Sequence, residues 1–223
     1  MATDKKKGAA FTRVVKNITV AVKEKGSDPA TNFKLRLAID QAKSVNMPKD
    51  NIDRAIERAS GSAGGSNFSP LVFEGFTPGG GAIIIESLSD NSTRTANEIK
   101  LIFSKNGGTL GAVKWMFDYF GVLAIAGDSV KDRDNFELQM IEAGAVDIKN
   151  DEGVVVIYTN PQDLEKIKNA AETLGAKVDY AGLNWVPKEK IALPDPSKET
   201  LFEQFFELLD ESEEVGEYYT NII

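Results

Sequence analysis

The chain has 223 residues, of which 42% are hydrophobic and 27% are charged, and its formal net charge is −8. It contains neither cysteine nor histidine. Disulfides, thiolate metal sites, a cysteine nucleophile and an imidazole general base are therefore excluded. No apolar run approaches the roughly 20 residues of a membrane span, and the N-terminus lacks the apolar core of a secretory signal. We expect a cytoplasmic protein without catalytic activity, cofactor, metal or membrane contact.

Positive charge is concentrated near the N-terminus. Residues 1–60 contain 13 Lys/Arg and 7 Asp/Glu, whereas residues 61–223 contain 13 and 27. A basic segment on an acidic body indicates a surface for nucleic acid or another polyanion. A helical domain with lysines on its solvated face would have the same composition, so charge alone leaves both interpretations open.

The first 60 residues predict three short helices that pack as a small bundle. Apolar side chains recur at helical spacing in residues 11–22, 35–45 and 52–59. Asp28 is the expected cap of the second helix, because Pro29 suits the first helical position.

A change of pattern follows the sequence SGSAGGSN, residues 60–67, whose composition marks a domain boundary. Residues 71–76 and 81–88 predict two strands joined by the glycine-rich turn TPGGG. This turn lacks the Lys-Ser/Thr of a phosphate-binding loop, so we interpret it as a hairpin. Residues 112–127 predict two further strands, broken near Tyr119–Gly121.

Both tryptophans, Trp115 and Trp185, are predicted in strands as packing residues. Stacking on a nucleic-acid base is the alternative for either indole.

An internal repeat begins at Gly121. Residues 121–148 and 153–180 each predict a strand, a helix and a second strand, and Gly144 and Gly175 end the two helices. Two such units in tandem are typical of a ferredoxin-like domain.

The C-terminal tail predicts a helix and a last strand, which would complete the preceding domain of strands and one helix. The fold class is therefore α+β, with an N-terminal three-helix domain and two α+β domains, the third inserted into the second. The expected domains are residues 1–66, residues 67–120 plus 191–223, and the ferredoxin-like insertion 121–190.

A polar junction between strand and helix, LSDNSTRT, is the strongest candidate for a small anion site. One residue from Asp90 to Thr93 would cap the helix. The free N–H groups at that helix start, together with Arg94, would suit a phosphate or carboxylate. A capped turn in which Arg94 pairs with Asp90 explains the pattern as well, and it is the interpretation that we prefer.

Five segments in this order resemble the YebC/PmpR family of probable transcriptional regulators, which includes mitochondrial translational activators. The most distinctive piece, NMPKDNIDRAI, lies within the first of these segments. They are residues 11–61, FEGFTPGGGAIIIESLSDN, RTANEI, FSKNGG and EAGA. The resemblance implies a helical N-terminal domain, two α+β domains with the third inserted into the second, and regulation linked to nucleic acid without catalysis.

We therefore predict a non-enzymatic, DNA-binding transcriptional regulator whose basic helical domain, residues 1–66, contacts phosphates. We call this domain the head. The predicted contact residues are Lys5, Lys6, Lys7, Arg13, Lys16, Arg36, Arg54, Arg58 and Arg94. The alternative is a translation factor that binds ribosomal RNA or the ribosome, for which the mitochondrial matrix is a second location. A protein partner bound through the acidic C-terminal domains is the third hypothesis.

Overall fold

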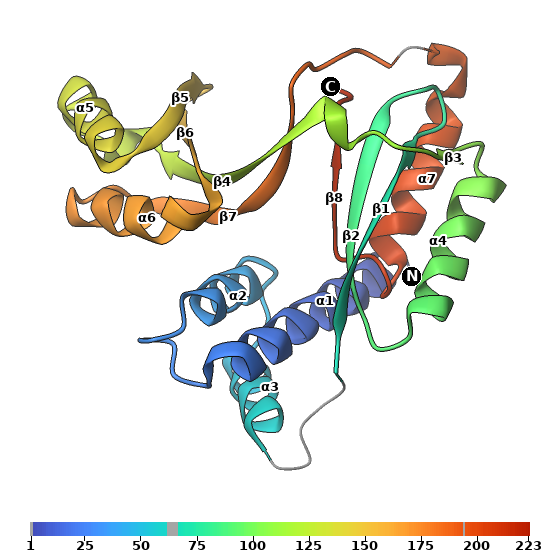
Figure 1. The fold of residues 1–223 in the computed structure, drawn as a ribbon, viewed down its shortest axis with the longest axis horizontal. Coiled ribbons are helices and arrows are strands. Elements are labelled where there is room, and N and C mark those ends of the chain that lie inside the picture. Colours follow the sequence, from blue (N-terminus) through green and yellow to red (C-terminus); the bar gives the residue numbers. More distant parts are fainter. Residues whose placement is uncertain (1, 62–66, 194) are drawn as a thin grey trace. The chain divides into compact units, whose positions relative to one another are not determined.

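The computed structural model describes residues 2–61, 67–193 and 195–223, and the chain divides into two compact units (Figure 1). Unit 1 comprises Met1–Phe117 and Pro187–Ile223, and unit 2 comprises Asp118–Val186. Unit 2 is thus inserted between two segments of unit 1, as the predicted fold class requires. None of the helices in the described ranges has the length and apolar character needed to cross a membrane.

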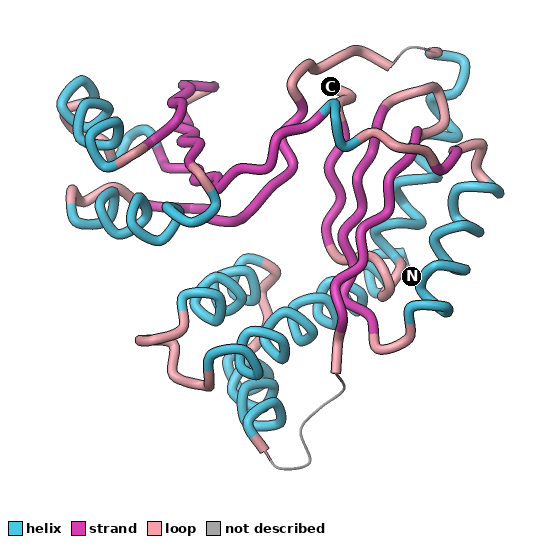
Figure 2. Tube along the Cα trace, in the orientation of Figure 1, coloured by secondary structure: helices cyan, strands magenta, loops and turns pink. Residues whose placement is uncertain are grey.

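The N-terminal part of unit 1 is a bundle of three helices (Figure 2). Their bounds are α1 Ala2–Lys25, α2 Phe33–Ser44 and α3 Lys49–Ser60. Helical spacing places the apolar side chains on one face of each helix, and the three faces form a single buried cluster. Its buried members are Val14, Ile18, Ala21, Val22, Leu35, Ala38, Ala42, Met47, Ile52, Ala55 and Ala59. The predicted three-helix domain is confirmed.

The cap of α2 is Asn32, so the prediction of Asp28 is wrong. The Asn32 side chain accepts from the Leu35 N–H at 3.0 Å and donates to the carbonyls of Ala21 and Gly26. An amide can do both, whereas an ionised carboxylate only accepts. Asn32 therefore joins the end of α1 to the start of α2, and Asp28 closes the turn before it by accepting from the Ala30 N–H.

The rest of unit 1 is a four-stranded antiparallel sheet with two helices on one face (Figure 1). The strand order is β3-β1-β2-β8. The elements are β1 Ser69–Phe76, β2 Ala82–Ser89, α4 Ser92–Lys105, β3 Thr109–Leu110, α7 Glu199–Glu211 and β8 Glu217–Thr220. The C-terminal helix and strand do complete this sheet, since β8 pairs with the central strand β2.

The core under this sheet joins β2 to both helices. Ile83 and Ile85 project from alternate positions of β2 onto Phe103 of α4 and Phe205 of α7. The two phenylalanine rings meet edge to face, with centroids 5.0 Å apart. Because α7 comes from the far end of the chain, this contact binds the two segments of unit 1 together.

Unit 2 has the ferredoxin-like topology that the repeat predicted. Its strand order is β5-β6-β4-β7, and β6 pairs antiparallel with both of its neighbours. The elements are β4 Phe117–Ala126, α5 Arg133–Ala143, β5 Ala145–Asp151, β6 Val154–Thr159, α6 Leu164–Thr173 and β7 Val178–Pro187. Gly144 and Gly175 have positive φ angles of 112° and 80°, which glycine adopts at little cost.

The predicted break near Tyr119–Gly121 is wrong, because β4 runs through these residues without interruption. Gly121 allows close packing instead of ending a strand. A Cβ at this position would lie 2.7 Å from the Thr159 methyl group and 3.0 Å from Leu164 Cβ. Glycine in a strand often marks such a close approach.

We expect Phe205→Ala to lower the free energy of unfolding by about 3–5 kcal/mol, because it empties a fully buried aromatic site. Urea denaturation of the full chain measures this. Leu208→Ala is the matched control, since Leu208 lies on the same helix with 40% of its surface exposed. An equal loss in the two variants would contradict the described core.

Candidate nucleic-acid interface

Helix α1 places two of its cations at the C-terminal end of α7. The Arg13 guanidinium donates to the carbonyls of Leu209, Asp210 and Ser212 at 2.7, 2.8 and 3.3 Å. Lys16 donates to the next carbonyl, that of Glu213, at 2.7 Å. The last carbonyls of a helix lack intrahelical partners and carry partial negative charge. Arg13 and Lys16 therefore cap α7 from a different part of the chain.

Two further lysines of α1 face acidic side chains of the same helix end. The Lys6 ammonium lies 3.3 Å from Asp210, and that of Lys5 lies 3.7 Å from Glu211. Lys5 is largely exposed, and exposed pairs of this kind contribute about 0–1 kcal/mol. These two ion pairs add little to the contact between α1 and α7, to which the hydrogen bonds of Arg13 contribute most.

Arg94 binds the same region from α4. Its Nε donates to Glu214 at 2.7 Å and its Nη2 donates to Asp90 at 2.6 Å. Asn91 caps the helix by accepting from the Arg94 N–H at 3.0 Å, and the hydroxyl of Thr95 also binds Glu214. The preferred interpretation, a capped turn with an Arg94–Asp90 pair, is confirmed.

Glu214 is a partner of Arg94 that the sequence did not reveal. It lies 120 residues away in the chain and reaches Arg94 because α7 packs beside α4. No local pattern signals such a contact. We call residues 209–214 the junction segment, since cations from α1 and α4 converge on it.

Electrostatics favour the charged form of every partner in this contact. Burial alone would raise the pKa of Glu214, but hydrogen bonds from Arg94 and Thr95 outweigh it and lower that pKa. The hydrogen bond from Arg94 also lowers the pKa of Asp90. The hydrogen bonds to Glu214 and Asp90 in turn raise the pKa of Arg94.

Of the remaining predicted residues, Arg36 makes internal contacts, whereas Lys7, Arg54 and Arg58 are exposed. Arg36 donates to the carbonyls of Pro29 and Ala30 and lies over the Phe33 ring, so it holds the loop before α2. Lys7 is exposed, with its ammonium 5.7 Å from the centre of the Phe11 ring.

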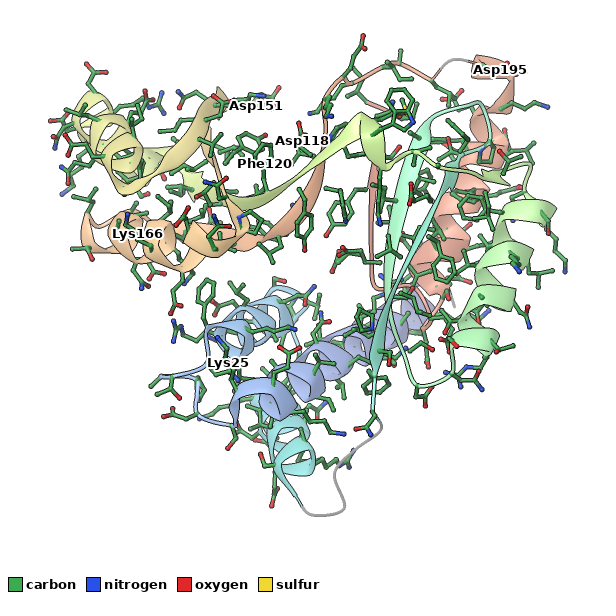
Figure 3. The ribbon with its side chains drawn as sticks, in the orientation of Figure 1. Lys25, Asp118, Phe120, Asp151, Lys166 and Asp195 are labelled. Carbon is green, nitrogen blue, oxygen red and sulfur yellow. The ribbon has the colours of Figure 1, made fainter. Side chains whose placement is uncertain are left out.

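Arg54 and Arg58 are exposed on α3, and their spacing of four residues places them on one side of that helix. Within the described ranges, neither makes an ion pair or a hydrogen bond through its side chain. The same holds for Lys49, at the start of α3, and for Lys25, labelled in Figure 3 at the end of α1. The prediction had left out Lys25 and Lys49.

The structure thus does not gather the nine predicted cations on one surface. Lys5, Lys6, Arg13, Lys16 and Arg94 meet at the junction segment, where acidic groups and carbonyls surround them. In the described part of the chain, no three acidic side chains come together in a way that could hold a metal ion.

Fold and charge together define an α+β protein in which a basic helical head is fastened to an acidic body. The model of the TACO1/YebC N-terminal domain matches residues 1–62, and that of the TACO1/YebC second and third domain matches residues 68–222. The chain belongs to the TACO1/YebC family. The predicted YebC/PmpR resemblance is therefore confirmed.

Relatives of similar length support this assignment. A probable transcriptional regulatory protein of Caldanaerobacter subterraneus is 42% identical over 222 residues, which cover 98% of this chain and 91% of the relative. One from Thermotoga maritima is 39% identical over 224 residues, with 99% and 88% covered. The family is thus one of regulatory proteins and not of enzymes, as predicted.

The fold also matches a known crystal structure, that of a conserved hypothetical protein from Aquifex aeolicus. The TM-score is 0.81 at 33% identity, and the match covers 97% of this chain and 90% of the other.

We expect Arg13→Ala to destabilise unit 1 by about 1.5–3 kcal/mol, because carbonyls at the end of α7 lose a charged donor. Hydrogen exchange should speed up in the last turn of α7. Arg13→Lys should give an intermediate value, since the ammonium keeps the charge but ends a shorter side chain than the guanidinium. Arg58→Ala is the control, and an equal effect there would argue against the cap.

We expect Glu214→Gln to lower the stability at pH 7 by about 1–3 kcal/mol. The folded-state pKa of Glu214 is lowered, so its contribution is present above the unfolded pKa and is lost as pH falls through the folded value. The difference between wild type and variant should therefore shrink below about pH 4.5. Denaturation at several pH values measures this, and Glu207→Gln, at an exposed site, is the control. A difference that stays constant down to about pH 3 would contradict the assignment.

Proposed function

We propose that the chain is a cytoplasmic nucleic-acid-binding regulator that contacts DNA phosphates through its helical head. Two findings support this. Relatives covering nearly the whole chain carry the name of transcriptional regulatory proteins, and the head carries the excess of positive charge in an otherwise acidic molecule.

The observation that carries the proposal is the set of head cations that internal contacts leave available. Lys25, Lys49, Arg54 and Arg58 are exposed and make no side-chain ion pair or hydrogen bond within the described ranges. Such side chains give up no existing partner when they bind phosphate. Lys7, which lies near an aromatic ring but no described acid, belongs with them.

The cations at the junction segment have a different role in this proposal. Arg13, Lys16 and Arg94 could bind phosphate only by releasing carbonyls and carboxylates that already satisfy them. We therefore assign Arg13 and Lys16 to holding the head in place and Arg94 to joining α4 to the segment after α7. The DNA contact is assigned to Lys7, Lys25 and the cations of α3.

The test is the affinity of Arg54→Ala/Arg58→Ala for duplex DNA, measured by fluorescence anisotropy across a salt series. Removal of one phosphate-binding cation should reduce the slope of log affinity against log salt by about 1, so the double variant should reduce it by about 2. Lys100→Ala/Lys105→Ala, which removes the same charge from the exposed side of α4, should leave the slope unchanged. Equal reductions of the slope in the two double variants would show that only the net charge matters. That result would contradict a DNA-binding surface on α3.

The same titration tests the translation alternative. Phosphate contacts do not distinguish DNA from RNA, so structured RNA is added as a competitor. A ribosomal role would be favoured over DNA binding by two results together. Structured RNA would displace the bound duplex at a far lower concentration than competing duplex DNA does, and the chain would co-sediment with ribosomes.

A further inference from the structure

The two tryptophans of the chain differ in exposure. Trp115 lies in a 3-10 turn with 69% of its surface accessible, so the prediction of a packing residue in a strand is wrong for it. The prediction is right for Trp185, which lies in β7 and packs on Tyr119 with ring centroids 4.7 Å apart. The lysine beside the exposed indole, Lys114, pairs with Glu74, so charge does not single out a partner for Trp115.

Helix α5 of unit 2 carries another exposed apolar surface. It packs beside α6 and β5 and buries Phe136 and Met140 (Figure 1). On its other side, Leu138 is 55% exposed and Ile141 is 60% exposed. Their spacing of three residues makes these two side chains neighbours on the helix surface. The solvated side of a helix normally carries polar residues, so we single out this apolar pair and call it the α5 surface.

Acidic side chains flank the α5 surface. Asp134 and Glu142 lie four residues before and after Leu138, and Glu137 lies four residues before Ile141. Within the described ranges, Asp134 and Glu142 form no ion pair or side-chain hydrogen bond. Glu137 accepts a hydrogen bond from the Asn150 amide at 3.1 Å, which leaves its charge in place. The apolar pair is thus surrounded by carboxylates that are not neutralised.

The cations of α5 and of the elements packed against it are directed elsewhere. Arg133, the only cation of α5, lies against Gly127, where an added Cβ would be 3.1 Å from its Nη2. Lys149 of β5 and Lys168 of α6 pair with acids of their own elements. In the described part of the chain, none of the three acids at the α5 surface has a cation within ion-pair distance.

The sign of the charge selects the class of partner. Residues 118–186 contain 13 Asp/Glu and 6 Lys/Arg, a net charge of 6 − 13 = −7. Nucleic acid and anionic lipid headgroups would therefore be repelled. Two copies that met symmetrically through α5 would oppose like charges. A suitable partner offers apolar side chains to the exposed pair and cations to the acids.

We propose that the α5 surface docks a basic amphipathic helix of a partner protein. Leu138 and Ile141 pack into the apolar stripe of that helix, and the three flanking acids pair with lysines or arginines on its sides. The surface lies within unit 2, outside the head, and the inference does not depend on DNA binding.

A synthetic peptide of leucine and lysine, about 18 residues long and amphipathic at helical spacing, tests the proposal. Fluorescence anisotropy of the labelled peptide should show saturable binding to the full chain. The same peptide with glutamate in place of lysine should not bind. Absence of binding by the leucine–lysine peptide would overturn the proposal.

Leu138→Gln/Ile141→Gln should weaken peptide binding by about 10- to 100-fold, because about half of each apolar side chain is still available for burial. Leu101→Gln/Leu208→Gln makes the same change at helical sites of unit 1 that are 50% and 40% exposed, and it should leave the affinity unchanged. Circular dichroism of both double variants checks that they fold.

Asp134→Asn/Glu142→Gln should also weaken peptide binding and reduce its salt dependence. Glu203→Gln/Glu207→Gln, which removes the same charge from exposed sites of α7, is the control. An equal loss of affinity in the two variants would show that only net charge attracts the peptide, and the proposed surface would be wrong.

The two proposed surfaces can fail independently. Leu138→Gln/Ile141→Gln should retain binding to duplex DNA, and Arg54→Ala/Arg58→Ala should retain binding to the peptide. If the chain self-associates in light scattering and Leu138→Gln/Ile141→Gln abolishes this, a second copy occupies the α5 surface and the proposal of a basic partner is wrong.

Discussion

The end of α7 governs the architecture of unit 1. A helix C-terminus presents carbonyls without partners, and here Arg13 and Lys16 from α1 satisfy them. Arg94 binds Glu214 just beyond the same helix end, so α1, α4 and α7 meet at residues 209–214. The negative end of one helix thereby fixes the basic head against the body, although Arg13 and Leu209 are 196 residues apart in the chain.

This contact separates the cations of the head into those that stabilise the fold and those that can bind a ligand. Lys5, Lys6, Arg13 and Lys16 of α1 contribute to the fold, whereas Lys7, Lys25 and the cations of α3 make no side-chain ion pair or hydrogen bond within the described ranges. Counting Lys and Arg along the sequence could not separate the groups, because both belong to the same basic segment.

Prediction succeeded where the signal was local or repeated. Gly144 and Gly175 ended helices as expected, and the tandem repeat defined the ferredoxin-like topology. Prediction failed where the role of a residue depends on neighbours that are distant in the sequence. Gly121 suggested a break in a strand, yet it permits close packing of Thr159 and Leu164. The cap of α2 is Asn32 and not Asp28, because its side chain must donate hydrogen bonds as well as accept one.

The sequence by itself determined the helical head, the two α+β parts and the family, because periodicity, turn residues and motif order are properties of the chain. Only the tertiary structure decided which cations are engaged and which tryptophan is exposed. Arg94 illustrates the difference: its pair with Asp90 lies within one helical turn and could be inferred. Its bond to Glu214 exists only because α7 packs beside α4, and long-range packing leaves no local pattern to identify in advance.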